Sequence, residues 1–250
     1  MWADVHCHFD YFENPAEIIA EAEKAGVKRI IANSTTLEGL HKCLALKMQF
    51  PKNISVALGY HPTHIFEDQQ ARRDETMNHI IEHASEAIAF GEIGLDFDEQ
   101  TSKEEKELQF SIFKKFISLS KEFQKPLIVH ARGSRAEVLK SLQEENAQKA
   151  LLHSFVCKEK QMQQLLSTGF FVSVGAGVLN SEWIQKFAQE LPLEKLLLET
   201  DSPLEFLGEK CTPAWIPKIA EKIAELKKIP ASSVQKAVEK NFQELFGKQF

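Results

Sequence analysis

The sequence predicts an α/β fold, a (β/α)₈ TIM barrel in which residues 1–250 form a single domain with extra C-terminal helices. First, short apolar runs alternate with amphipathic helical patterns, and strand ends recur every 21 to 38 residues, the length of one strand, one loop and one crossover helix. Second, the 250 residues are 43% hydrophobic, which is enough for one large core. Third, several expected strands end in histidine or carboxylate side chains. This is typical of a barrel, because all of its strands point their C-terminal ends to the face that holds the active site.

Eight strands are expected from runs of β-branched and aliphatic residues. In order, they lie at the start of 1–10 and at 27–32, 54–58, 87–91, 127–129, 150–152, 169–174 and 196–198. Amphipathic helices are expected between them, including one at 37–50 and a long one that ends before Pro126. Two further helices, one at 213–227 and one that begins at Ser232, remain to pack on the barrel.

Three of the expected helices carry capping signals at their starts. Asn14 precedes a proline at the first helical position, so it is expected to cap the first helix. Ser102 with Glu105, and Ser232 with Gln235, have the three-residue spacing of a capping box. These signals predict where the helices begin.

Composition excludes some classes of function. The formal net charge of -6 and the pI near 5.9 argue against a protein that coats nucleic acid electrostatically. The four cysteines form no C-x-x-C pair, which is typical of reduced thiols in a cytoplasmic protein. The sequence shows neither a signal peptide nor an apolar run long enough for a membrane helix, and no obligate protein partner is evident. We therefore expect a cytoplasmic protein that does not bind membranes.

The candidate metal ligands begin with His6 and His8. Residues two apart in a strand point to the same side, so both imidazoles can bind one ion, although such a pair alone is a weak signal. Further histidines and carboxylates at later strand ends strengthen it: Glu92, His130, His153 and Asp201. Six such side chains exceed the three protein ligands of one catalytic zinc ion, so we expect two metal ions. We assign His6, His8 and Asp201 to the first ion, His130 and His153 to the second, and Glu92 to the bridge between them.

Two divalent ions joined by a carboxylate predict hydrolysis. Such a pair can hold a shared water as hydroxide near neutral pH, which attacks a phosphorus or carbonyl carbon. Asp201 and Glu92 are the expected catalytic carboxylates, with Asp201 placed to take the proton of the water. The residue types fit Mg²⁺, Zn²⁺ or Mn²⁺ and do not decide among them. Each ligand has another possible role when taken alone, such as an ion pair for Glu92 or a loop cap for Asp201.

Three residues are candidates for substrate binding. Arg132 and Arg135 follow the predicted fifth strand, and a guanidinium fork suits phosphate oxygens, although surface charge or an ion pair would also explain them. His61 follows the third strand, where it either contacts the substrate or orders the surrounding Gly-Tyr-His-Pro turn. Both interpretations stay open at this point.

Six segments together resemble the TatD family of metal-dependent deoxyribonucleases, within the wider amidohydrolase-type barrels. They are His6-Cys7-His8-Phe9-Asp10, Gly59-Tyr60-His61-Pro62, Gly91-Glu92-Ile93-Gly94-Leu95-Asp96, Val129-His130-Ala131-Arg132, Leu152-His153-Ser154-Phe155 and Leu198-Glu199-Thr200-Asp201-Ser202-Pro203. The resemblance implies the same six metal ligands and hydrolysis of DNA phosphodiester bonds, often from the 3' end. Many members carry an aspartate where this chain has Gly133, a difference on the substrate side.

Three functions are therefore compared. The leading hypothesis is a two-metal deoxyribonuclease, a 3'–5' exonuclease that prefers single-stranded DNA or 3' ends. The second is a small-molecule amidohydrolase, lactonase or phosphoesterase with the same metal centre, which the acidic charge balance permits. The third is a non-catalytic binding protein with a relic metal site.

Overall fold

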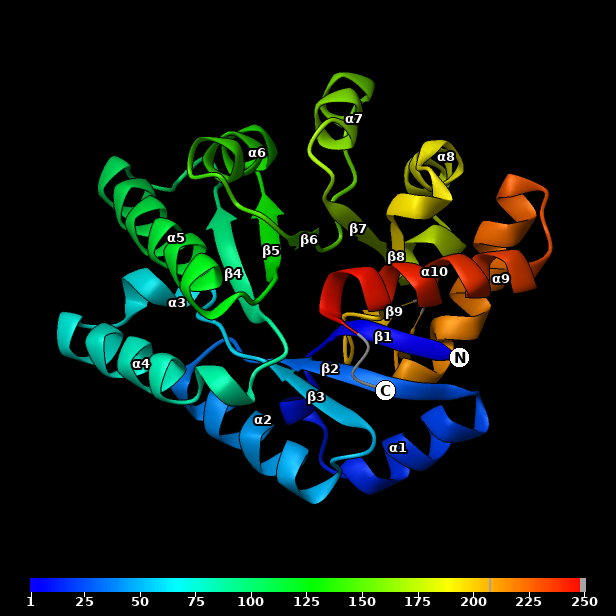
Figure 1. Cartoon of the computed structure of the whole chain (residues 1–250), viewed down its shortest axis with the longest axis horizontal. Coiled ribbons are helices and arrows are strands. Elements are labelled where there is room, and N and C mark those ends of the chain that lie inside the picture. The colour runs from blue at the N-terminus through cyan, green and yellow to red at the C-terminus, as the bar shows by residue number, and fades with distance from the viewer. Residues whose placement is uncertain (207, 248–250) are drawn as a thin grey trace.

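A computed structural model describes residues 1–206 and 208–247, and within these ranges it confirms the predicted barrel of eight parallel strands (Figure 1). The barrel strands are β1 (Trp2–Cys7), β2 (Val27–Asn33), β3 (Ile54–Ala57), β4 (Phe90–Asp96), β5 (Leu127–Arg132), β6 (Ala150–Leu152), β7 (Phe171–Val174) and β8 (Leu196–Leu198). Within the runs β1 to β3 and β4 to β8, each strand pairs in parallel with the next in sequence, as expected when a helix crosses over after every strand.

The ring of strands closes at two short contacts. Continuous pairing gives a three-stranded sheet, β1-β2-β3, and a five-stranded sheet, β4 to β8. A parallel bridge between Ala57 and Ala89 joins β3 to the start of β4. At the other seam, the backbone N–H of Asp201 donates to the carbonyl of His6 over 2.9 Å. This second seam places candidate ligands from opposite ends of the chain, His6 and Asp201, side by side.

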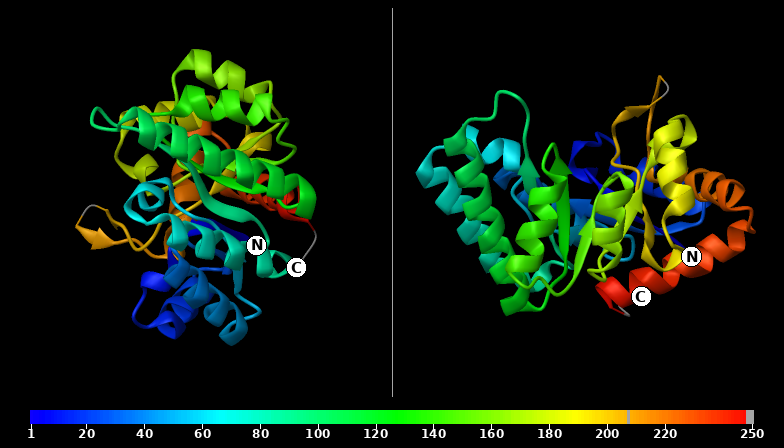
Figure 2. Two further views of the ribbon diagram at one scale, coloured as in Figure 1. Left: turned by 90° about the vertical axis from the view of Figure 1, so that its left-hand side faces the viewer. Right: turned by 90° about the horizontal axis from the view of Figure 1, so that it is seen from above.

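Helices surround the strands, as the two rotated views in Figure 2 show. They are α1 (Pro15–Lys24), α2 (Leu37–Gln49), α3 (Pro62–Glu67), α4 (Gln70–Glu82), α5 (Lys103–Phe123), α6 (Arg135–Glu144), α7 (Glu159–Leu166), α8 (Glu182–Glu190), α9 (Ile216–Lys227) and α10 (Ala231–Phe246). After β8 the chain forms a small antiparallel hairpin, β9 (Glu205–Phe206) and β10 (Glu209–Lys210). The helices of the described ranges are all too short or too polar to cross a membrane.

The N-terminal end of the barrel is filled by apolar side chains. One residue from each strand or its start belongs to this cluster: Val5, Ile31, Ala57, Ala89, Ile128, Leu151, Phe171 and Leu197. Phe242, Leu245 and Phe246 of α10 pack on the same cluster and cover it. The prediction that the last helix packs on the barrel is confirmed, and this end is closed to solvent.

Several predicted boundaries are confirmed. Strands at 150–152 and 196–198 have the expected bounds, and Ser102 and Glu105 form the predicted capping box at the start of α5. Asn14 takes the N-cap position of α1, but within the described residues its side chain makes no capping hydrogen bond. The buried cysteines are all free thiols, in agreement with the predicted reduced state.

Several predictions of element boundaries are wrong, and β5 is one of them, because it runs on past His130 to Arg132. β4 runs on past Glu92, because Ile93 and Leu95 are buried and continue to pair with β5. α10 begins at Ala231 rather than at a Ser232 cap, because the carbonyl of Pro230 already accepts the first-turn hydrogen bond. The short helix α3, which follows directly after His61, was not predicted.

Candidate metal centre

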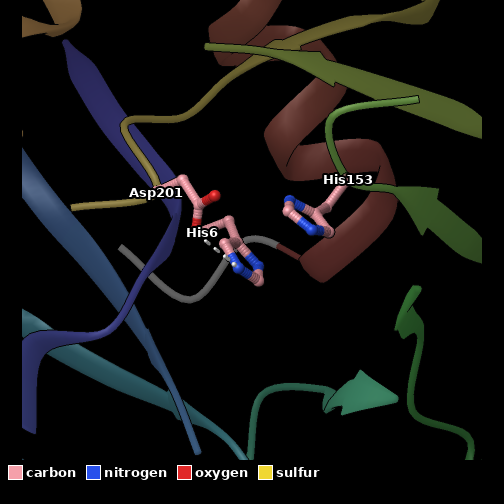
Figure 3. Close-up of side chains that lie close together, drawn as sticks. All are labelled: His6, His153 and Asp201. Carbon is pink, nitrogen blue, oxygen red and sulfur yellow. Dashed lines mark ion pairs between the residues drawn. The ribbon is translucent and has the colours of Figure 1, made fainter. Parts of the chain in front are cut away.

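The C-terminal end of the barrel brings together all six predicted ligands. His6 and His8 come from β1, Glu92 from β4, His130 from β5, and His153 and Asp201 from the ends of β6 and β8. All except the fully buried His6 line one cavity of about 470 Å³. Figure 3 shows three of these side chains, His6, His153 and Asp201, meeting at the centre of the barrel.

Glu92 lies at the centre of the cluster, and its two carboxylate oxygens face different histidines. Oε2 is 3.6 Å from His6 Nε2 and 3.4 Å from His8 Nε2. Oε1 is 2.9 Å from His130 Nδ1 and 3.1 Å from His153 Nε2. The carboxylate therefore separates two groups of imidazoles, each close enough to share a cation with it.

Local backbone geometry explains why Glu92 reaches this position. The pairing of β4 with β5 is irregular between Phe90 and Ile93, and such irregularities re-aim side chains next to active sites. At Gly94, φ is +140°, and a Cβ there would lie 2.1 Å from the carbonyl oxygen of His130. Only glycine permits this approach of β4 to β5, which holds Glu92 and His130 at their short distance.

Asp201 completes the group around the β1 histidines. Its Oδ1 lies 3.4 Å from His6 Nε2 and 3.3 Å from His8 Nε2, and Figure 3 marks the first of these contacts. The His6 ring stacks on that of His153, with centroids 3.9 Å apart. Neither ring nitrogen of His6 has a hydrogen-bond partner in the described part of the chain, although the residue is fully buried. Because buried polar atoms are rarely left unpaired, this imidazole fits a metal ligand.

The electrostatics keep both carboxylates ionised. Burial disfavours the charge of Glu92, yet the surrounding imidazoles, His61 most strongly, hold its pKa well below the ordinary value. Burial acts on Asp201 in the same way, and the contacts from His6 and His8 outweigh it, so its pKa is also lowered. Burial lowers the pKa of His6, which favours the neutral imidazole that binds metals. Burial opposes the charge of His8, His130 and His153, yet the neighbouring carboxylates raise the pKa of all three, that of His8 to about 9. A divalent cation bound here would therefore replace the protons on these imidazoles.

Two buried carboxylates outside the predicted set orient the histidines. Asp96 Oδ2 lies 2.9 Å from His130 Nε2, and Glu199 Oε2 lies 3.3 Å from His153 Nδ1. Carboxylates commonly fix the ring orientation of metal-binding histidines in this way. Neither role was predicted from the sequence. Asp96 is four residues after Glu92 in one strand, and this even spacing, which places both on one face, was the available signal.

The structure places the three predicted substrate-binding residues around the cavity. His61 orders the turn, because its Nδ1 accepts from the Thr63 N–H at the start of α3. Its Nε2 lies 3.5 Å from Glu92 Oε1 beside the cavity, and contact with the substrate stays a prediction. Arg132 Nε donates to Asp96 Oδ1 over 3.0 Å. Arg135 opens α6 and lies over the buried ring of Phe155.

A parallel α/β barrel with histidines and carboxylates gathered at the C-terminal strand ends defines a class, the metal-dependent hydrolases. The model of the family described as TatD related DNase matches residues 3–247, so the chain belongs to the TatD family of metal-dependent hydrolases. The resemblance stated from the sequence is thereby confirmed.

Individual relatives agree with this family. A protein of Haemophilus influenzae named an uncharacterized metal-dependent hydrolase is 32% identical over 255 residues, covering 98% of this chain and 99% of the relative. The human protein named deoxyribonuclease TATDN3 is 30% identical over 260 residues, covering 98% and 94%. The crystal structure of the Escherichia coli TatD homologue YJJV superposes with a TM-score of 0.86 at 26% identity, covering 98% of this chain and 97% of that one.

Proposed function

We propose that this protein is a deoxyribonuclease of the 3'–5' exonuclease type, which acts on single-stranded DNA or DNA 3' ends with two divalent ions per chain. The observation that carries this proposal is the divided Glu92 carboxylate. One oxygen faces the two histidines of β1, and the other faces those of β5 and the β6 end. The name of the human relative supports DNA as the substrate.

The metal ligands we propose are those predicted from the sequence. His6, His8 and Asp201 take the first ion, His130 and His153 the second, and Glu92 lies between them. Imidazole donors suit Zn²⁺ or Mn²⁺, and carboxylate bridges with phosphate substrates also suit Mg²⁺. When bound, the two ions would lower the pKa of the attacking water and neutralise negative charge on the phosphate.

Asp201 is the residue we propose as the proton acceptor. Its side chain is 26% exposed and lines the cavity, whereas that of Glu92 is 3% exposed and lies enclosed by histidines. A base must reach the proton it removes, so the accessible carboxylate suits this role better than the enclosed one. Glu92 instead fixes the spacing of the two groups of imidazoles.

The phosphate is held, in this proposal, by Arg132 and Arg135. Only the Nε of Arg132 is bonded within the described residues, to Asp96, which leaves its terminal NH₂ groups for phosphate oxygens. Arg135 Nε is buried and lacks a hydrogen-bond partner in residues 1–206 and 208–247. Gly133 between them has φ of +64°, and a Cβ there would lie 2.0 Å from the Phe97 carbonyl oxygen. A larger side chain at this position, such as aspartate, would therefore not fit.

The size of the cavity supports action at a chain end. A volume of about 470 Å³ falls within the range of sites that enclose one small ligand. One terminal nucleotide has that scale, whereas a duplex does not. Tyr11 and Leu204, each 57% exposed, line the rim and offer apolar surface to an unstacked base.

The test is hydrolysis of single-stranded DNA labelled at either end, by protein loaded with Mg²⁺, Mn²⁺ or Zn²⁺, beside Asp201→Asn. We expect stepwise shortening from the 3' end, lost in Asp201→Asn although that variant still folds. Arg135→Gln should raise KM more than it lowers kcat, since it removes a phosphate contact and leaves the metal ligands in place.

Other outcomes would contradict the proposal in different ways. Intact DNA with every ion, together with turnover of a lactone, amide or small phosphoester, would favour the small-molecule hydrolase. Metal binding without turnover of any of these substrates would favour the non-catalytic protein. Internal cuts in a circular single strand would exclude the exonuclease type.

A further inference from the structure

A second histidine cluster lies on the outer wall of the barrel, between α2 and α4. It comprises His41 of α2, and His79, Glu82 and His83 at the end of α4. None of these residues lines the cavity of the candidate metal centre. We propose that this cluster is a separate binding site for one divalent transition-metal ion of the zinc type, which joins α2 to α4. The inference does not rest on the proposed nuclease activity.

The ligand atoms of α4 are already close together. His79, Glu82 and His83 each offer one ligand atom, and these atoms all lie within 4.8 Å of one another. Residues three and four apart lie on one face of a helix, so the last turn of α4 presents all three side chains in the same direction. The two imidazole rings are nearly parallel, with an interplanar angle of 14°.

His41 brings a ligand from the neighbouring helix. Its Nε2 lies 3.4 Å from Nδ1 of His79. Two nitrogen ligands on one tetrahedral zinc ion, with Zn–N bonds of about 2.1 Å, are separated by about 3.4 Å. The spacing of His41 and His79 therefore matches that of two ligands on one ion, whereas the ligand atoms that already lie together are those of His79, Glu82 and His83. A shift of the His41 side chain toward Glu82 and His83 would complete a site of three imidazoles and one carboxylate.

Glu86 provides a carboxylate that orients His83, as is common around metal-binding histidines. Its Oε1 lies 2.7 Å from Nδ1 of His83, which fixes the proton on that nitrogen and leaves Nε2 free as a ligand. The backbone carbonyl of Glu86 accepts from Lys47 Nζ of α2 over 2.7 Å, so the same turn is already tied to α2. This arrangement distinguishes the cluster from a chance group of surface histidines.

The donor set defines the class of ion. Imidazole-rich sites prefer Zn²⁺, Cu²⁺ or Ni²⁺, whereas Mg²⁺ and Ca²⁺ prefer oxygen donors. With His41 recruited as the fourth ligand, the protein would fill a tetrahedral zinc shell, so the ion would have a structural role. We expect it to hold α2 against α4 without taking part in hydrolysis.

Equilibrium dialysis against Zn²⁺, followed by elemental analysis, tests the site on the full chain. The double variant His79→Gln/His83→Gln should bind one zinc equivalent fewer than the wild type. The substitutions Glu92→Gln and Asp201→Asn weaken metal binding at the candidate metal centre. In that background, His79→Gln/His83→Gln should again remove one equivalent of bound zinc. Equal stoichiometry with and without His79 and His83 would overturn the proposal.

Two further measurements separate this site from weak surface binding. Glu86→Gln should weaken zinc binding at the cluster about 10-fold, as loss of an outer-shell carboxylate commonly does. Glu75→Gln, an exposed carboxylate on α4 that pairs with Arg72, is the matched control and should leave the affinity unchanged. Zinc should also slow amide hydrogen exchange in α2 and α4 of the wild type. Equal slowing in His79→Gln/His83→Gln would refute a bridging ion.

Discussion

At the N-terminal end of the barrel, each strand or its start contributes one apolar side chain to a cluster that α10 covers. At the C-terminal end, β1, β4, β5, β6 and β8 instead carry imidazoles and carboxylates at or just after their ends. The covered end gains stability from packing. The open end keeps His6 buried without a hydrogen-bond partner among the described residues, a cost that a bound cation would offset. Stability and chemistry are thus separated along the barrel axis, and substitutions at the two ends should affect different measurements.

The largest effect should follow Glu92→Gln at the open end. The amide is neutral and lacks the second anionic oxygen that would bridge two ions, so both groups of histidines lose their shared partner. We expect activity to fall by more than the roughly 10- to 100-fold typical of removing an outer-shell partner. Steady-state hydrolysis and metal stoichiometry measure the loss, with circular dichroism as the check of folding. Wild-type metal content and activity in this variant would contradict the central role of Glu92.

Phe242→Ala tests the covered end. Phe242 is 3% exposed and packs in the apolar cluster beneath the strands, so truncation leaves a cavity. A loss of about 3–5 kcal/mol in the free energy of unfolding is expected, measured by urea denaturation. Met48→Ala, at a side chain that is 79% exposed, is the control and should change stability by less than about 0.5 kcal/mol. Loss of metal binding by folded Phe242→Ala protein would show that the two ends are coupled.

The candidate ligands at the open end were easier to predict from the sequence than the start of α10 at the covered end. The six candidate ligands follow from local motifs at strand ends, because parallel strands necessarily deliver their C-terminal ends to one face. The roles of Asp96 and Glu199 could not be assigned in that way, since they depend on the side to which His130 and His153 turn their second nitrogen. The start of α10 was misplaced because Ser232 has the composition of a cap, while Pro230 takes that position in three dimensions.

The surface histidine cluster shows the same limit more strongly. His79 and His83 have a helical spacing that is visible in the sequence. His41 joins them only because α2 and α4 are neighbours on the barrel wall, and no local pattern predicts that contact. Local signals therefore predict elements and strand-end motifs, whereas contacts between elements require the fold.

A smaller loss should follow Asn241→Leu, which tests how α10 is fixed to the covered end. The buried Asn241 amide donates to the carbonyls of Leu193 and Leu196, both over 2.7 Å. Leucine has a similar size but leaves both carbonyls without this donor, at a cost of about 1–3 kcal/mol. The midpoint of urea unfolding measures this loss of stability. Metal stoichiometry should stay unchanged. An unchanged midpoint would mean that α10 is held by apolar packing alone.

The smallest effect is expected from Asp98, in the exposed loop after β4 at the open end. Its carboxylate accepts from the Thr101 hydroxyl and from the N–H groups of Gln100 and Thr101, and the Thr101 hydroxyl most strongly lowers its pKa. Because the pKa of Asp98 is lower in the folded than in the unfolded chain, its ionised carboxylate stabilises the fold. This stabilisation is complete above the unfolded pKa of about 3.9 and is lost as pH falls through the folded pKa. Asp98→Asn should therefore flatten the fall in urea midpoint between pH 5 and pH 3. Glu99→Gln is the control, because the Glu99 carboxylate accepts no hydrogen bond within the described residues, and its urea midpoint should change with pH as in the wild type. The same pH dependence in all three proteins would show that the loop after β4 adds nothing to stability in acid.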